Sequence, residues 1–138
     1  MQKSTQELMH RLKEVDDIKA FFDENELELT KETVQGYLGG LLMVKNLKTA
    51  EVAQLSGQGD YVYKVFQGKR KASRDILLAI SIGMNLTCPE TQMLLRIAQT
   101  AQLDPRNRRD SVIIYSLNNG IPIESVNDLL FDNNEITL

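Results

Sequence analysis

Apolar residues recur along the chain at intervals of three and four, which is the spacing of one face of an α-helix. Polar or glycine-containing breaks separate these stretches, and short polar residues precede several of them. The pattern therefore predicts an all-α chain. The expected helices cover a stretch from Ser4 to about residue 22, and then residues 31–45, 49–56, 60–67, 74–84, 88–101, 105–117 and 123–132.

Short polar side chains at the helix starts support these boundaries, because they accept hydrogen bonds from the first backbone N–H groups. The expected caps are Ser4, Thr30, Asp60, Ser73, Thr87 and Asp104. Ser4 and Thr87 are each followed three residues later by glutamate, which makes a capping box. Asp104 is followed by Pro105, and proline is favoured at the first helical position.

Three stretches stand out within this helical pattern. Residues 76–86, ILLAISIGMNL, are apolar nearly all round, which predicts a central buried helix. Residues 111–117, SVIIYSL, could also form a strand, because three β-branched residues lie together, but the start signal before them favours a helix. Gly36, Gly39 and Gly40 indicate either close contact with another helix or a weak, bent helix.

The composition is that of a soluble globular protein. The chain has 138 residues, of which 42% are hydrophobic and 25% charged, enough for one ordinary compact domain. Its one cysteine, Cys88, excludes an internal disulfide and favours a reducing compartment. We find neither a signal-peptide pattern nor an apolar run long enough to cross a bilayer, so we expect a cytoplasmic protein without a membrane partner.

Charge is unevenly distributed along the chain, whose net charge is −3. Residues 45–75 hold seven basic and three acidic residues, for a net charge of +4. The flanking segments are acidic, with net charges of −4 for residues 1–32 and −3 for residues 76–138. Because nucleic-acid binding depends on the local field, the central basic block keeps this function open.

The basic block contains two short predicted helices joined by a glycine-containing turn. Ala53 supplies a small residue where the two helices would cross, and Gly57 allows the turn. Val62 and Val65 would attach the second helix to the core, leaving its outer side chains exposed to a DNA groove.

The stretches TAEVAQLSG, YVYKVFQGKRKASRD and ILLAISIGMNL resemble the lambda-repressor-like, or Xre-type, DNA-binding family over about residues 33–87. The whole chain also resembles a small Firmicutes-type group of such regulators, which share a C-terminal stretch like PRNRRDSVIIYSLNNGIPIESVNDLL. The resemblance implies a five-helix helix-turn-helix core within residues 31–103. It further implies an acidic N-terminal helix in residues 1–30 and a C-terminal helical extension in residues 104–138.

This resemblance implies a DNA-binding transcriptional regulator that contacts the major groove of double-stranded DNA, with no enzymatic activity, cofactor or metal. A homodimer is expected, with its interface on residues 1–28 or 105–138. The residues expected to contact DNA are Thr49, Tyr61, Tyr63, Lys64, Gln67, Lys69, Arg70, Lys71 and Arg74.

Position assigns roles to these residues. Tyr63, Lys64 and Gln67 share one helix face, where Gln67 suits adenine and Lys64 suits guanine or a phosphate. The basic residues 69–71 would hold the DNA backbone. Tyr61 is better suited to packing between helices, and the GKRK stretch alone is also typical of a solvated loop.

The alternative is a protein-interaction module with a degenerate helix-turn-helix that no longer reads DNA. The turn at residues 57–60 is one residue shorter than is usual in the family, and Gln58-Gly59 replaces an apolar turn residue. This shortening and the acidic flanks, which could bind a protein partner, favour the alternative. In either case the fold is expected to survive.

Other candidate sites are weak. Arg106, Arg108 and Arg109 form a second basic cluster, interpreted mainly as surface or intramolecular ion pairs because Asp104 and Asp110 lie beside them. The minor alternative is a second contact with nucleic acid or protein. His10 has no second metal ligand at a readable spacing, and Cys88 is most simply an inert structural thiol. No phosphate-binding glycine loop or nucleophile motif is present, which argues against an enzyme.

Overall fold

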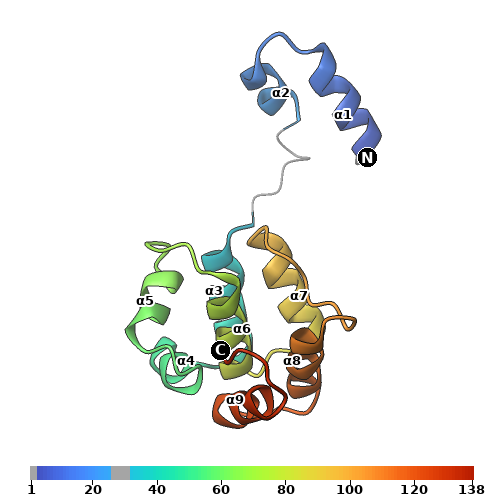
Figure 1. Ribbon diagram of the computed structural model, residues 1–138. Helices are drawn as coiled ribbons and strands as arrows, with labels where there is room; N and C mark the ends of the chain where they lie inside the picture. Colours follow the sequence, from blue (N-terminus) through green and yellow to red (C-terminus); the bar gives the residue numbers. More distant parts are fainter. Residues whose placement is uncertain (1–2, 26–31) are drawn as a thin grey trace. The chain divides into compact units, whose positions relative to one another are not determined.

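The computed structural model describes residues 3–25 and 32–138, and all regular structure in these ranges is helical (Figure 1). The all-α prediction is therefore confirmed for the described residues. The chain divides into two compact units, residues 1–31 and residues 32–138. Within the described ranges, no helix combines the length and the apolar character needed to cross a membrane.

The first unit contains α1 (Thr5–Glu14) and α2 (Ile18–Glu24). Ser4 caps α1 as predicted, since its side chain accepts a hydrogen bond from the Glu7 N–H at 3.1 Å. The expectation of one continuous helix to about residue 22 is wrong. The chain leaves the helical conformation at Val15, and Asp17 then caps α2 by accepting from the Lys19 N–H. Aspartate favours a helix N-terminus over a helix C-terminus, which explains the break.

The second unit contains α3 (Val34–Lys45), α4 (Thr49–Leu55), α5 (Asp60–Phe66), α6 (Arg74–Gly83), α7 (Cys88–Ile97), α8 (Arg108–Asn118) and α9 (Ile123–Asp132). Helix α6 lies at its centre and contacts α4, α7, α8 and α9 (Figure 1). Residues 77–83 are all buried, so the predicted central helix is confirmed.

Helices α8 and α9 complete this core. Ile113 and Leu117 of α8 and Val126 and Leu130 of α9 are buried in the same hydrophobic cluster as α6. The stretch SVIIYSL is thus helical. The predicted boundary between residues 103 and 104 falls inside the second unit, because the apolar stripes that follow it are needed to cover α6.

The helix caps of the second unit follow the sequence in part. Ser73 and Thr87 cap α6 and α7 as predicted. Thr30 lies outside the described residues, and α3 begins three residues later than expected, with Thr33 as its cap. The prediction for Asp104 is wrong, because its carboxylate accepts from the Arg106 N–H within a turn. Helix α8 starts only after the cap at Asn107.

Two helices approach closely at a glycine, but this glycine is Gly83 and not one of those in α3. An added Cβ at Gly39 or Gly40 would meet no atom within 4 Å, so close helix packing does not explain these residues. A Cβ at Gly83 would instead lie 2.7 Å from the backbone nitrogen of Ser56. The end of α6 therefore packs directly on the backbone at the end of α4.

Candidate nucleic-acid interface

The turn between α4 and α5 consists of four residues, Ser56–Gly59. Two glycines with positive φ close it, Gly57 at 74° and Gly59 at 58°. The Gly59 N–H donates to the Ala53 carbonyl at 3.1 Å, and the buried Ser56 hydroxyl accepts from the Gln58 N–H at 3.3 Å. Both predicted features of the helix pair, the small buried Ala53 and the glycine turn, are present.

Gly59 has φ 58° and ψ −135°, a combination that is essentially restricted to glycine. Replacing Gly59 with L-alanine should therefore lower the free energy of unfolding by about 2 kcal/mol. The strain would come from the backbone alone, since no atom lies within 4 Å of the added Cβ. Urea unfolding followed by circular dichroism measures the change.

D-alanine at position 59 is the matched control, because the mirror image of this conformation is an ordinary extended one for an L-residue. D-alanine, introduced by chemical ligation, should restore the stability of the unsubstituted chain. Equal destabilisation by the two enantiomers would show that the turn conformation is wrong.

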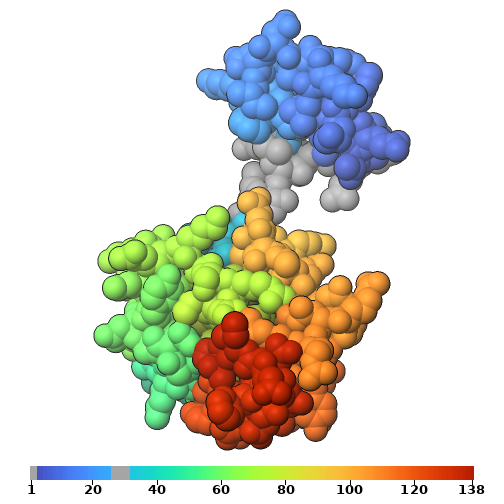
Figure 2. All heavy atoms as spheres, in the orientation of Figure 1, coloured from blue at the N-terminus to red at the C-terminus, as the bar shows by residue number. Residues whose placement is uncertain are grey.

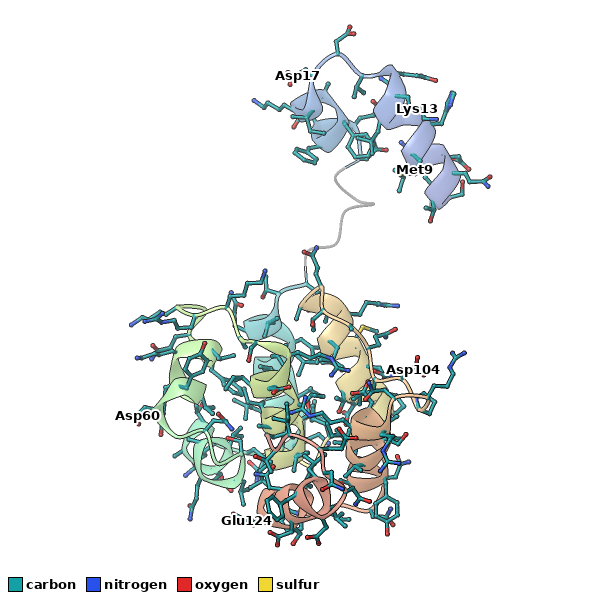
Figure 3. All side chains as sticks on the ribbon, in the orientation of Figure 1. Met9, Lys13, Asp17, Asp60, Asp104 and Glu124 are labelled. Atoms are coloured by element: carbon teal, nitrogen blue, oxygen red, sulfur yellow. The ribbon has the colours of Figure 1, made fainter. Side chains whose placement is uncertain are left out.

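Helix α5 presents a mixed polar face away from the core. Val62 and Val65 are fully buried, whereas Tyr63, Lys64 and Gln67 are exposed. The three side chains predicted to share one face are thus all exposed, as contact with DNA would require. Asp60, expected to be the cap, is instead the first helical residue, because Gly59 occupies the cap position. It lies at the outer edge of the same helix (Figure 3).

A Schellman motif ends α5 and directs the following residues outward. Gly68, at φ 72°, donates its N–H to the Val65 carbonyl, and the Lys69 N–H donates to the Lys64 carbonyl at 2.9 Å. Residues 69–71, here called the basic loop, are all exposed. No acidic side chain in the described part of the chain forms an ion pair with the basic loop or with Lys64.

The second group of arginines is neutralised by neighbouring carboxylates. Their ion pairs are Arg106–Asp104, Arg108–Glu135 and Arg109–Asp75, with the last at 2.8 Å. The Asp75 carboxylate raises the pKa of Arg109 by hydrogen bonding. The prediction of ion pairs is therefore confirmed for this group, but only Asp104 is an expected partner, because Asp110 pairs with Arg74. In Figure 2 this part of the chain, in orange, lies on the opposite side of the second unit from α4 and α5, in green.

Arg74, expected to contact DNA, is held within the second unit. Its guanidinium donates to the carbonyls of Ala101 and Gln102 and to the Asp110 carboxylate, the last at 2.9 Å. Asp110 is only 5% exposed, so this ion pair is shielded from water on the carboxylate side. Arg74 therefore joins α6 to α8. Its guanidinium is already hydrogen-bonded within the protein, unlike the exposed side chains of the basic loop.

Arg74→Gln should lower the free energy of unfolding by about 2 kcal/mol, because it leaves a buried carboxylate without its ion-pair partner. Exposed Arg106 is the control, since Arg106→Gln removes the same charge from the surface and should change stability by less than about 0.5 kcal/mol. Thermal or urea unfolding compares the two variants. Equal stabilities would contradict the structural role of Arg74.

The remaining predicted contacts lie at the edges of this face. Thr49 is half-buried at the first position of α4. Tyr61 is also half-buried, packs against the core, and places its hydroxyl 3.5 Å from the carbonyl oxygen of Lys71. This agrees with the interpretation of Tyr61 as a packing residue, and it links α5 to the basic loop.

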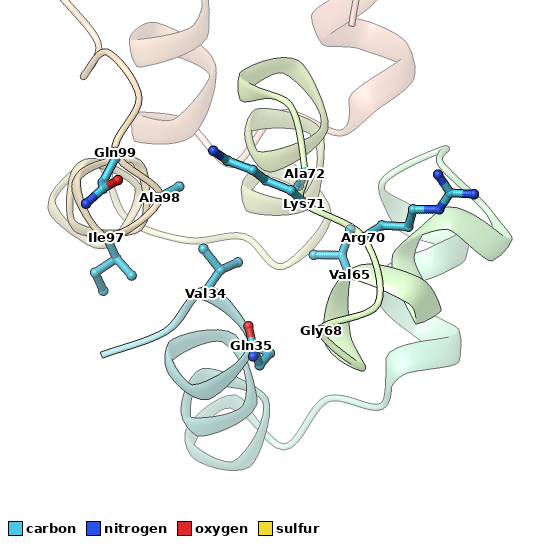
Figure 4. Close-up of a pocket in the computed structure, with 10 residues that line it drawn as sticks. All are labelled: Val34, Gln35, Val65, Gly68, Arg70, Lys71, Ala72, Ile97, Ala98 and Gln99. Carbon is cyan, nitrogen blue, oxygen red and sulfur yellow. The ribbon is translucent and has the colours of Figure 1, made fainter. Parts of the chain in front are cut away.

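A cavity of about 300 Å³ lies behind the basic loop (Figure 4). Val34, Val65 and Ile97 form its apolar lining, contributed by the start of α3 and the ends of α5 and α7. Arg70 points away from the cavity, whereas Lys71 extends along its rim (Figure 4). The Arg70 guanidinium is thus directed toward the outer surface.

Cys88 and His10 each have a simple structural setting. Partial burial raises the pKa of the Cys88 thiol, which disfavours a reactive thiolate. His10 contacts Glu14 at 2.5 Å on the exposed side of α1. Across residues 3–25 and 32–138, no three potential ligands among histidine, cysteine, aspartate and glutamate gather to hold a metal.

No protein-family model, curated protein or solved structure matches the chain.

Proposed function

We propose that the chain is a transcriptional regulator that binds double-stranded DNA through α4 and α5. In this proposal α3–α7 are the five helices of a lambda-repressor-like domain, and α4 and α5 are its helix-turn-helix. Helix α5 enters the major groove and the basic loop lies on phosphates. One observation carries the proposal: an exposed polar helix face leads directly into the basic loop, whose side chains form no ion pair with any acidic residue in the described part of the chain.

The side chains of α5 supply two kinds of contact. Gln67 has the amide geometry that pairs with adenine, and Lys64 can donate to guanine. Lys69, Arg70 and Lys71 supply the sequence-independent attraction to phosphates. Asp60 at the start of α5 opposes that attraction.

A protein-interaction module is the second candidate, and the short turn favours it. A turn of four residues between α4 and α5 is shorter than the usual turn of the family, so the first turn of α5 would meet DNA in a different position. The first residue of α5 is also acidic, Asp60. Such a module would use the same exposed face for a protein. Its binding would not depend on the basic loop.

Nuclear magnetic resonance of the isotope-labelled chain, titrated with a random-sequence duplex, distinguishes these candidates. We expect the largest backbone amide shifts within residues 59–71, and small shifts in α8 as the internal control. Shifts centred on α8, or none at all, would contradict the proposed DNA surface.

A further inference from the structure

The cavity behind the basic loop is lined by three helix ends that are far apart in the sequence (Figure 4). Val34 begins α3, Val65 lies in the last turn of α5, and Ile97 ends α7. Val65 is buried, whereas Val34 and Ile97 are half-buried. The cavity volume of about 300 Å³ lies at the lower end of the range of roughly 300–1,000 Å³ that is usual for small-molecule sites.

The apolar lining is built from packed residues. Ala72 and Ala98 complete it, and both are half-buried against the hydrophobic core. A Cβ at Gly68 would lie 2.9 Å from the side-chain nitrogen of Gln35, so the Gln35 side chain packs directly on the end of α5. The cavity is therefore formed before any ligand arrives, as is usual for small-molecule sites.

One cation faces this cavity. Lys71 extends along the rim, whereas its neighbour Arg70 points away (Figure 4). Lys71 forms no ion pair with an acidic side chain of residues 3–25 and 32–138. Gln35 and Gln99 add two exposed amide groups to the lining. The lining thus offers a single positive charge and neutral hydrogen-bond donors beside an apolar wall.

This combination selects one class of ligand. The apolar wall disfavours a phosphate or a dicarboxylate, because their several charges would lose water beside it. A monocarboxylate has one charge for Lys71 and a second oxygen that can accept from an amide N–H of Gln35 or Gln99. Its hydrocarbon body gains free energy by burial against Val34, Val65 and Ile97. We infer that the cavity binds a small aliphatic carboxylic acid in its ionised form.

Methyl nuclear magnetic resonance of the full chain, titrated with hexanoate in the absence of DNA, tests the inference. Hexanoate should shift the methyl signals of Val34, Val65 and Ile97 in a saturable way. Val126 is the internal control, because it lies in α9 and does not line the cavity. A titration without saturable shifts at the three cavity positions would overturn the inference.

Two variants test the role of Lys71. Lys71→Gln should raise the dissociation constant of hexanoate about fivefold, since it removes an ion pair at an exposed rim. Arg70→Gln is the matched control, because it removes the same charge at the neighbouring position, whose side chain points away from the cavity. It should leave the dissociation constant unchanged. Equal losses in the two variants would overturn the assignment of the carboxylate to Lys71.

Two further probes test the ligand class. Hexanamide keeps the hydrocarbon body without the charge, so it should bind more weakly than hexanoate and be insensitive to Lys71→Gln. Inorganic phosphate has charge without a hydrocarbon body and should leave the three methyl signals unchanged. Hexanamide that binds as tightly as hexanoate, or phosphate that shifts the same signals, would overturn the choice of an aliphatic acid.

A bound acid would also affect the basic loop, a consequence that rests on the proposed function. It would hold the Lys71 ammonium, which is one of the cations assigned to DNA phosphates. Saturating hexanoate should therefore lower the affinity for duplex DNA about fivefold, and this effect should be absent in Lys71→Gln. Equal affinities with and without hexanoate would overturn this coupling. The methyl titration contains no DNA, so it separates failure of the site from failure of DNA binding.

Discussion

Gly83→Ala is expected to lower the free energy of unfolding of the second unit by about 3 kcal/mol. The added Cβ would lie 2.7 Å from the Ser56 nitrogen, 2.9 Å from its Cα and 3.0 Å from the Leu55 carbonyl carbon. These are backbone atoms, which cannot move aside as the end of a flexible side chain can. The ends of α4 and α6 would have to separate.

Gly40→Ala is the control for this prediction. Gly40 lies within α3 and has no atom within 4 Å of an added Cβ, so alanine should raise the free energy of unfolding by about 0.5–1 kcal/mol. Urea unfolding followed by far-ultraviolet circular dichroism compares the variants at equal m-values. If both variants unfold at the same urea concentration, the close approach of α4 and α6 is wrong.

Removing two charges from the basic loop should have the largest effect on DNA binding. The double variant Lys69→Gln/Lys71→Gln is expected to weaken binding about 50-fold at about 0.1 M salt and to flatten the slope of log affinity against log salt by about 1.8. The slope follows from about 0.9 per neutralised phosphate. Fluorescence anisotropy titrations with a labelled duplex measure both quantities.

Arg106→Gln/Arg108→Gln is the charge-matched control, because it also removes two positive charges from exposed side chains. These arginines are paired with carboxylates, so the salt slope should stay unchanged. Equal losses in the two double variants would mean that net charge, and not the basic loop, drives binding. The loop would then have no special role.

The sequence predicted the local structure well where the signals are local. The Ser4 cap of α1, the capping box of α7, the buried stripe of α6 and the end of α5 before Gly68 depend on residues within one or two turns. The reciprocal bond of the capping box predicted at Ser4 and Glu7 is not formed in α1. Asp104 misled because aspartate caps a turn as readily as a helix; the cap of α8 is Asn107, whose side chain accepts from the Asp110 N–H.

The roles of Gly83 and Arg74 could not be predicted from the sequence, because both depend on contacts with residues far away in the chain. Gly83 packs against the backbone of Ser56, which lies far from it in the sequence. The apolar residues around Gly83 do not indicate that α4 is its neighbour. Arg74 follows the basic loop directly, so sequence proximity grouped it with the phosphate contacts. In the fold, the Arg74 guanidinium lies 2.9 Å from the Asp110 carboxylate, and this ion pair gives Arg74 a structural role. Arg74 and Arg109 each stand directly before an aspartate, but neither pairs with that neighbour. Arg109 pairs with Asp75 and Arg74 with Asp110, which only the packing of α6 against α8 reveals.

Selection from random duplex DNA with the purified chain, followed by titrations of the enriched duplex at two salt concentrations, tests the central claim most directly. The proposed function predicts one enriched motif, bound with an affinity that falls steeply as salt rises. That result would also show that the short turn between α4 and α5 supports base reading. No enriched motif, with equal binding by the basic-loop variant, would contradict DNA recognition by this surface.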